Sequence, residues 1–375
     1  MKVPATRPYF SEEDIKFVLD RFADILRGNS YLTMGKYAEE FEAKFANFIG
    51  VKFAVGCNSG TSALELICRA LDIRGKEIIL PSNTFVASAN AIINAGCTPV
   101  FADCNDDMCL DAEDAVRRIT PRTAAIMQVH IGGIVSASTI ALQRVCKERG
   151  IHLIEDAAQA HGSELKGTKA GAFGIAAGFS FFSTKVMTTG EGGMVTTNDG
   201  ALAKKMRSLR EFGKEPQDIY INYYTAMGYN WRLPEVSSLM GLRQLASLPE
   251  FVRRRQELAK IYDEEFAGHQ YILPVNPAEK AGHNYFKYLV ILPDHDRRLV
   301  HKALVAQTVY PSGYVYELPL HKQPVFPDAN KLSLPKTEFV CEHHLCPPIF
   351  YGMTDEQAHY VAQCLKNALR EMRPN

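Results

Sequence analysis

A lysine at the end of an apolar run is the residue of this sequence best suited to covalent chemistry. The stretch Gly178-Phe-Ser-Phe-Phe-Ser-Thr-Lys185 indicates an apolar strand followed by Lys185, and a loop of small residues ending in Gly193 comes next. Burial at a strand end disfavours the charged ammonium and so lowers the pKa of a lysine. A neutral amine is the nucleophile that forms a Schiff base with a carbonyl carbon. The sequence must therefore be searched for groups that would hold a carbonyl-bearing cofactor.

Two turns and a serine suit the phosphate and the ring of such a cofactor. Gly60 and Thr61 lie between a predicted strand and a predicted helix, where free backbone amides and a hydroxyl can bind a phosphate. Phe85 could stack on a flat ring, and Ser180 could bring its hydroxyl to the same phosphate. Taken singly, such a turn is more often an ordinary helix cap, and such a phenylalanine more often belongs to the core.

An acid and an amide follow another apolar run, residues 151–155. A carboxylate at Asp156 can pair with a protonated pyridine nitrogen, which keeps the ring poor in electrons. Gln159 could reach a hydroxyl on that ring. Asp156 alone could instead cap the next helix. The order of phosphate turn, aromatic, Asp with Gln, and then Ser with Lys predicts a pyridoxal 5'-phosphate site, with Lys185 and Asp156 as its catalytic residues.

Short apolar runs alternate with helix-like stretches from about residue 50 to 200. We expect strands at 53–56, 77–81, 99–102, 124–129, 151–155, 178–182 and 194–197, and helices at 61–71, 86–95, 112–119, 138–149 and 201–212. Asp111 is the expected N-cap of the third helix. This alternation predicts a mostly parallel sheet covered by helices on both faces. Ligands of such sheets bind beyond the carboxyl ends of the strands.

The second half of the chain predicts a smaller unit. Leucines recur every three residues from Leu239 to Leu248, and after Pro249 a second helix is expected at 251–266, bridging a large domain to a small one. Residues 286–292 are the expected strand, and 355–372 the expected helix, of an α/β unit. We therefore expect a large domain over residues 1–250 and a small C-terminal domain over 251–375.

Composition excludes several partners. Lys and Arg number 42, as do Asp and Glu, so neither nucleic acid nor a membrane surface is expected. Nine scattered cysteines without a CxxC pair argue against a disulfide framework. The spacing of Cys341-Glu-His-His-Leu-Cys346 fits no common zinc pattern, so no metal is expected.

The start lacks an apolar signal core and no apolar run approaches the ~20 residues of a membrane helix, which predicts a cytoplasmic protein.

Specific motifs occur in a fixed order over nearly the whole chain. They are Tyr31-Leu-Thr-Met-Gly35, Asn58-Ser-Gly-Thr61, Pro81-Ser-Asn-Thr-Phe85, Glu155-Asp-Ala-Ala-Gln-Ala-His161, Ser180-Phe-Phe-Ser-Thr-Lys185, Gly190-Glu-Gly-Gly193, Gly228-Tyr-Asn-Trp-Arg232 and Pro319-Leu-His321. In this order they resemble the DegT/DnrJ/EryC1/StrS family of pyridoxal-phosphate-dependent sugar aminotransferases. The resemblance implies the fold-type I (aspartate aminotransferase-like) class, with a mixed, mostly parallel seven-stranded sheet and a smaller C-terminal α/β domain.

The resemblance also implies a role for each matched residue. Lys185 matches the Schiff-base lysine, Asp156 the partner of the pyridine nitrogen, Gln159 the contact to the ring hydroxyl, Phe85 the stacking aromatic, and Gly60, Thr61 and Ser180 the phosphate cradle. Asn230 matches an asparagine that reaches the phosphate of the neighbouring subunit, which implies a homodimer with shared active sites. His161 and His321 fall near the family's substrate cleft. The stretch 309–316, which helps to shape that cleft, matches only loosely.

The implied reaction is a ping-pong transamination. An amino donor, L-glutamate or L-glutamine, gives its amino group to a keto-sugar, most simply one joined to a nucleotide diphosphate. One branch of the family has histidine in place of the lysine and performs dehydration, so Lys185 favours transamination. Three alternatives stay open: amination of a keto-cyclitol, a pyridoxal-phosphate-dependent sugar dehydratase or lyase on the same fold, and a regulatory or sensor protein that keeps the fold without catalysis.

Overall fold

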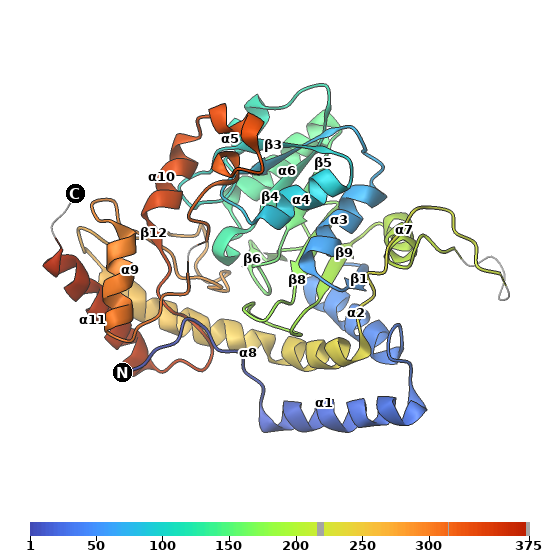
Figure 1. Ribbon diagram of the computed structural model, residues 1–375, viewed down its shortest axis with the longest axis horizontal. Helices are drawn as coiled ribbons and strands as arrows, with labels where there is room; N and C mark the ends of the chain where they lie inside the picture. The colour runs from blue at the N-terminus through green and yellow to red at the C-terminus, as the bar shows by residue number, and fades with distance from the viewer. Residues whose placement is uncertain (216–220, 314, 373–375) are drawn as a thin grey trace.

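The protein is a two-part α/β structure built on one large sheet. The computed structural model describes residues 1–215, 221–313 and 315–372 (Figure 1). The larger helices are α1 (Glu12–Asp24), α2 (Lys36–Ile49), α3 (Gly60–Ala70), α4 (Val86–Asn94), α5 (Ala112–Arg117), α6 (Ala137–Arg149), α7 (Gly200–Arg210), α8 (Glu235–Phe266), α9 (Arg297–Ala306), α10 (Pro335–His343) and α11 (Asp355–Glu371). None of these described helices has both the length and the apolar content needed to cross a membrane.

The large sheet confirms the predicted architecture. Its strands are β1 (Phe53–Cys57), β2 (Glu77–Pro81), β3 (Thr98–Ala102), β4 (Thr123–Val129), β5 (His152–Asp156), β8 (Ala176–Ser180) and β9 (Gly193–Thr197), in the order β1-β9-β8-β5-β4-β2-β3. Only β9 runs antiparallel to its neighbours β1 and β8. The seven expected strands and five expected helices lie within two residues of their predicted ends, and Asp111 caps α5 by accepting from the Asp114 amide.

Two apolar layers cover the two faces of this sheet. On one face, Phe41 and Phe45 of α2 and Leu239 of α8 pack together in one buried cluster. On the other face, α3 and α4 contribute buried leucine and isoleucine side chains. Alternate residues of β2 belong to opposite layers: Ile79 joins the first cluster and Ile78 the second. The period of two follows from the pleat of a strand, and it explains why these strands are almost wholly apolar.

Helix α8 is longer than the sequence predicts. The expected break at Pro249 is wrong, because one helix runs from Glu235 to Phe266 with Pro249 inside it. Proline removes one helical hydrogen bond, but the flanking Leu248 and Phe251 are buried and hold the helix on the sheet. The bridging role is confirmed, since α8 runs from beside the large sheet to the C-terminal unit (Figure 1).

The C-terminal unit has a core of its own, but the chain returns from it to the large sheet. Leu258 and Tyr262 of α8 pack against α11 residues such as Leu365 in this core, which also includes Val3. Residues 320–334 instead place buried side chains in the apolar layer to which α3 and α4 contribute. The boundary between residues 250 and 251 falls inside α8 and stays a prediction.

The expected strand at 286–292 is largely wrong. Only Val290–Ile291 forms a strand, β11, between β10 (Leu273–Pro274) and β12 (His344–Leu345). The residues before it contact the large domain, since the Lys287 amide donates to the Gly132 carbonyl. Their apolar pattern reflects packing between the two units and not strand pairing. The helices α1 and α2 were not predicted at all.

Candidate active site

A cavity of about 460 Å³ opens at the carboxyl ends of the parallel strands. Seven of the predicted site residues line it: Gly60, Thr61, Phe85, Asp156, Gln159, Ser180 and Lys185. They come from the ends of β5 and β8 and from the starts of α3 and α4, segments that are far apart in the sequence. The sheet thus brings together in one cavity the groups that sequence order alone suggested.

The start of α3 forms a cradle with the end of β8. Ser59 caps the helix by accepting from the Ser62 amide, so Gly60 and Thr61 occupy its first two positions. Amides at these positions have no acceptor within the helix and can bind an anion. A Cβ atom on Gly60 would lie 2.6 Å from the Cβ atom of Ser180. Only glycine therefore allows the helix start and Ser180 to approach each other this closely.

Asp156 is buried at the end of β5 and held in one orientation. Its Oδ2 atom accepts from Ser88 Oγ at 2.7 Å, and its Oδ1 atom accepts from the Ala158 amide at 3.1 Å. Burial raises the pKa of Asp156, while the Ser88 hydrogen bond and the positive charge of Lys185 oppose that rise. A cationic ring nitrogen bound beside it would oppose the rise further and favour the carboxylate.

Lys185 follows β8 and lines the same cavity as Asp156. Its Nζ atom lies 5.0 Å from the centre of the Phe286 ring. Burial lowers the pKa of Lys185 to about 8; the Asp156 carboxylate opposes this shift and the Lys287 ammonium adds to it. At pH 7 roughly one molecule in ten would then carry the neutral amine, compared with about one in several thousand for an exposed lysine. The amine is therefore prepared to attack a carbonyl carbon.

Gln159, Phe85 and Tyr316 complete the walls. The Gln159 side chain accepts from the Gly132 amide at 2.7 Å and donates to the Tyr316 hydroxyl at 3.0 Å. The Phe85 ring is 56% exposed although it opens onto this cavity, and it lies 6.0 Å from the Tyr316 ring. An aromatic face left open in this way is suited to stacking on a planar ligand.

Three predicted residues do not line the cavity. Asn230 is exposed on the segment after α7, where it bridges to Glu211. His161 is buried beside the rings of Phe179 and Phe181, and burial lowers its pKa to about 3. Its imidazole is thus neutral at physiological pH.

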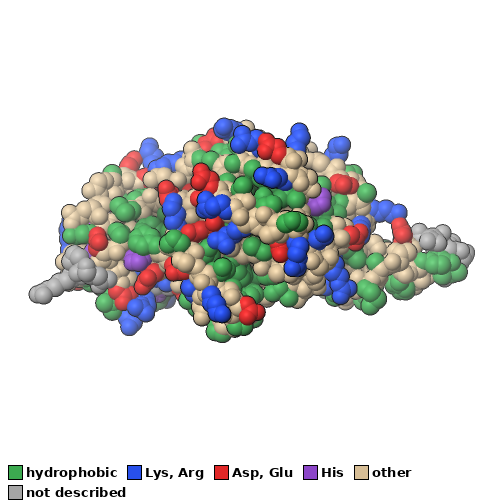
Figure 2. All heavy atoms as spheres, turned by 90° about the horizontal axis from the view of Figure 1, so that it is seen from above, with side chains coloured by type: hydrophobic (Ala, Val, Ile, Leu, Met, Phe, Trp, Pro, Cys, Tyr) green, Lys and Arg blue, Asp and Glu red, His purple; other side chains and the backbone are tan. Residues whose placement is uncertain are grey.

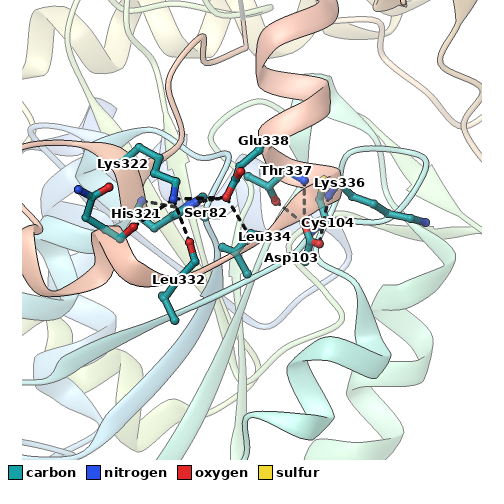
Figure 3. Close-up of polar contacts among 11 residues, drawn as sticks. Ser82, Asp103, Cys104, His321, Lys322, Leu332, Leu334, Lys336, Thr337 and Glu338 are labelled. Atoms are coloured by element: carbon teal, nitrogen blue, oxygen red, sulfur yellow. Dashed lines mark hydrogen bonds and ion pairs between the residues drawn. The ribbon is translucent and has the colours of Figure 1, made fainter.

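His321 lies behind the wall, where it joins two segments (Figure 3). Its Nδ1 atom lies 2.8 Å from Ser82 Oγ, and its Nε2 atom lies 3.0 Å from Glu338 Oε1. Ser82 follows β2 and leads to Phe85, whereas Glu338 belongs to α10. The contact with substrate stays a prediction for both histidines.

Sequence reasoning did not assign several residues that line the cavity, among them Ser88, Phe286, Lys287 and Tyr316. A signal existed for two of them. Ser88 is three residues after Phe85 at the start of a helix, which places the two side chains on one face. Lys287 interrupts the apolar run 285–292, and a charge inside such a run is unusual. Tyr316 belongs to the loosely matching stretch 309–316, of which residue 314 lies outside the described residues.

The side chains and amides that line the cavity fit the chemical groups of pyridoxal phosphate. The cradle at Gly60, Thr61 and Ser180 suits the phosphate, the buried Asp156 suits a ring nitrogen, and Phe85 offers a ring face. Lys185 offers the amine for the aldehyde. Each group of the cofactor therefore has a matching group in this cavity.

Comparison with known proteins shows the family to which this chain is related. The profile of the DegT/DnrJ/EryC1/StrS aminotransferase family matches residues 12–366. GDP-perosamine synthase of Vibrio cholerae is 31% identical, over 97% of this chain and 98% of its own. UDP-N-acetyl-3-dehydro-alpha-D-glucosamine 3-aminotransferase of Acidithiobacillus ferrooxidans is 34% identical over 94% of both chains. The structure of Helicobacter pylori PseC, an aminotransferase of pseudoaminic acid biosynthesis, superposes with a TM-score of 0.92 at 30% identity, covering 99% of this chain and 100% of PseC.

Proposed function

This chain belongs to the DegT/DnrJ/EryC1/StrS aminotransferase family and is a pyridoxal-phosphate-dependent sugar aminotransferase, and we propose that it moves the amino group of L-glutamate or L-glutamine to a nucleotide-linked keto-deoxysugar. The observation that carries the proposal is the meeting of Lys185, Asp156 and the start of α3 in one cavity. Relatives named for GDP-linked and UDP-linked sugars support a nucleotide-linked acceptor.

Seven of the residues that line the cavity have a task in this reaction. When bound, pyridoxal phosphate supplies an aldehyde that bonds to amines and a ring that withdraws electrons from the carbon bearing the amino group. Gly60, Thr61 and Ser180 would hold the phosphate, and Phe85 would cover one face of the ring. Asp156 would accept a hydrogen bond from the ring nitrogen and so favour its protonated form.

Lys185 is the base and the acid of the reaction. Its amine would take the proton from the α-carbon of the donor and would deliver it to the cofactor. In the half-reaction with the keto-sugar, Lys185 would move a proton in the reverse direction. Gln159 would bind the ring hydroxyl and so help to orient the ring toward this amine.

A spectrum of the purified protein tests the proposal. The visible absorption band of the bound cofactor is expected to bleach on addition of L-glutamate without an acceptor, with one 2-oxoglutarate formed per site. A glutamine-dependent bleach would identify L-glutamine as the donor. Ammonia without a 2-oxo acid would indicate the dehydratase or lyase alternative. A bound cofactor that no amino acid alters would indicate the regulatory alternative and contradict the proposal.

The partner implied by Asn230 is a second copy of this chain. The described part of the segment after α7 extends away from the rest of the molecule (Figure 1), and hydrophobic side chains lie on it (Figure 2). Tyr224 is 59% exposed and Met227 is 90% exposed. Exposed apolar side chains on an extension are typical of a protein interface. This supports a homodimer in which each subunit lends Asn230 to the other site.

Mixing two inactive variants tests the dimer. Lys185→Ala lacks the amine, and Asn230→Asp places a negative charge near the phosphate of the neighbouring site. Coexpression is expected to restore about a quarter of the activity, because half of the dimers are mixed and each of these has one intact site. If mixing restores nothing although mixed dimers form, Asn230 acts within its own subunit.

A cytoplasmic location also belongs to this proposal. All nine cysteines are free and buried, as expected where thiols stay reduced. On the face seen in Figure 2, acidic and basic side chains are interspersed. This mixed charge agrees with small molecules, and neither nucleic acid nor a membrane, as the substrates and ligands of the protein.

A further inference from the structure

The cavity contains one basic side chain that the proposed reaction does not use. Among the described residues that line it, Lys185 and Lys287 are the basic ones, while Asp156 and Glu191 are acidic. Lys185 is committed to the cofactor and to proton transfer. An amino acid donor must bring at least one carboxylate into this space, because its amine has to reach the position where the Lys185 amine works. A carboxylate removed from water needs a cationic or hydrogen-bonding partner.

The position of Lys287 suits that partner. The ammonium groups of Lys185 and Lys287 both lie near the Phe286 ring, 5.0 and 5.1 Å from its centre. The Lys287 backbone is fixed, since its amide donates to the Gly132 carbonyl at 3.1 Å. Both lysines line the same cavity, and the charge of Lys287 is one of the causes that lower the pKa of Lys185, so a ligand in this cavity can meet both side chains.

Lys287 also has hydrogen-bonding capacity to spare. Its ammonium donates to the Ser312 carbonyl oxygen, and an ammonium has three donors, so two remain for a ligand. Among the described residues, no acid lies within ion-pair distance of Lys287, although 28 such contacts occur elsewhere. Burial lowers the pKa of Lys287, as expected for a cation without an anionic partner. The charge is therefore left for a ligand to neutralise.

We propose that Lys287 binds a carboxylate of the amino donor and so selects amino acids for the first half-reaction. This inference rests on the proposed function. The donor is favoured over the diphosphate of the acceptor, because an α-carboxylate is attached to the same carbon as the reacting amine. The diphosphate is separated from the reacting carbon by a sugar ring. The acidic side chains of Asp156 and Glu191 would repel a carboxylate elsewhere in the cavity.

Neutralisation of Lys287 would also act on Lys185. The ammonium of Lys287 is one of the causes that hold the pKa of Lys185 down. A bound carboxylate would offset this charge, so the protonation of Lys185 would follow the presence of donor. The keto-sugar brings no carboxylate to this point, and the two substrates would therefore meet different electrostatic environments in the same cavity.

Direct binding of a carboxylate tests the inference. The probe is glutarate, which has two carboxylates and no amine, titrated into the cofactor-loaded protein and followed by the cofactor spectrum and by calorimetry. Lys287→Gln is expected to bind glutarate roughly 10- to 100-fold more weakly, the loss expected for one charge-assisted hydrogen bond. Lys287→Arg should recover part of this affinity, because the charge is kept. Equal affinity of Lys287→Gln and the unmodified protein would overturn the inference.

The donor half-reaction separates this inference from the function on which it rests. With L-glutamate, Lys287→Gln should lower kcat/KM by a similar factor, mainly through KM. A similar loss with L-glutamine identifies the α-carboxylate as the ligand, and a loss with L-glutamate alone identifies the side-chain carboxylate. Lys302→Gln, at an exposed position of α9, is the matched control. Cofactor absorption and the midpoint of thermal unfolding show that each variant is folded.

Failure of the unmodified protein to react with any amino acid would contradict the proposed function, whereas glutarate binding would still report on Lys287. A reactive protein whose Lys287→Gln variant keeps full kcat/KM would contradict the inference alone. The two proposals therefore fail through different results.

Discussion

Replacing Lys185 with alanine is expected to lower turnover by roughly 10⁴-fold. The substitution removes the amine that we propose moves the proton between donor and cofactor, and we expect no other described residue of the cavity to take over this role. Lys287 is the other lysine of the cavity, but its ammonium is held by the Ser312 carbonyl. The measurement is the rate of 2-oxoglutarate formation from L-glutamate in the presence of added cofactor.

Small amines distinguish the loss of a base from the loss of structure. Methylamine added to the Lys185→Ala variant should enter the space left by the side chain and restore part of the rate, since a free amine can move the same proton. A misfolded variant would show no such rescue. Lys52→Ala, at an exposed position before β1, is expected to keep normal activity. Full activity of Lys185→Ala would rule out the assigned mechanism.

The sheet was predictable because its strands are buried on both faces. The β2 strand shows why: Ile78 and Ile79 point into opposite apolar layers, so the run has no polar position. An apolar run of this kind, bounded by helix signals, predicts a strand that is buried on both faces of a sheet. The site residues at the strand ends were predictable for the same reason, because the carboxyl ends of parallel strands meet at one edge of the sheet.

Features that depend on contacts between the two units were not predictable. The run 285–292 is as apolar as a strand, yet Lys287 hydrogen-bonds through its backbone to Gly132 of the large domain instead of pairing in a sheet. Pro249 suggested a helix end, but packing of its buried neighbours decided otherwise. Tyr316 reaches the cavity from a loop. Its hydrogen-bond partner, Gln159, is 157 residues away in the sequence. Local patterns contain no information about such pairs.

Hydrogen bonds around the cavity also hold the turn that carries Phe85, and the sequence motifs do not predict them. Ser88 donates to Asp156 and also lies 2.9 Å from Thr84 Oγ1, so the turn that carries Phe85 is joined by hydrogen bonds to Asp156. On the other side of this turn, Ser82 contacts His321, which is held in turn by Glu338 (Figure 3). Hydrogen bonds on both sides of Phe85, from α4 and from the segment before α10, thus hold the turn that carries it.

Replacing Asp156 with asparagine is expected to lower kcat by roughly 10²- to 10³-fold, the loss typical of removing one preorganised electrostatic group. Asparagine has the same shape, so the site is kept, but it has no charge to hold the ring nitrogen protonated. The ring then withdraws fewer electrons and the α-proton becomes harder to remove. The measurement is the single-turnover rate with L-glutamate, which is free of any effect on product release.

The fold of this variant should change little. Ser88 Oγ can accept from the asparagine amide instead of donating to the carboxylate, because a hydroxyl serves in both directions. The Ala158 amide keeps an oxygen acceptor. Thermal unfolding of the variant should therefore match that of Asp106→Asn, a substitution of an acid that is 95% exposed and far from the chemistry. If Asp156→Asn kept the full rate, the ring would not depend on this carboxylate, and the cofactor would have to bind in another orientation. A large loss of rate with normal unfolding, by contrast, would assign the effect to charge alone, since shape and stability are unchanged.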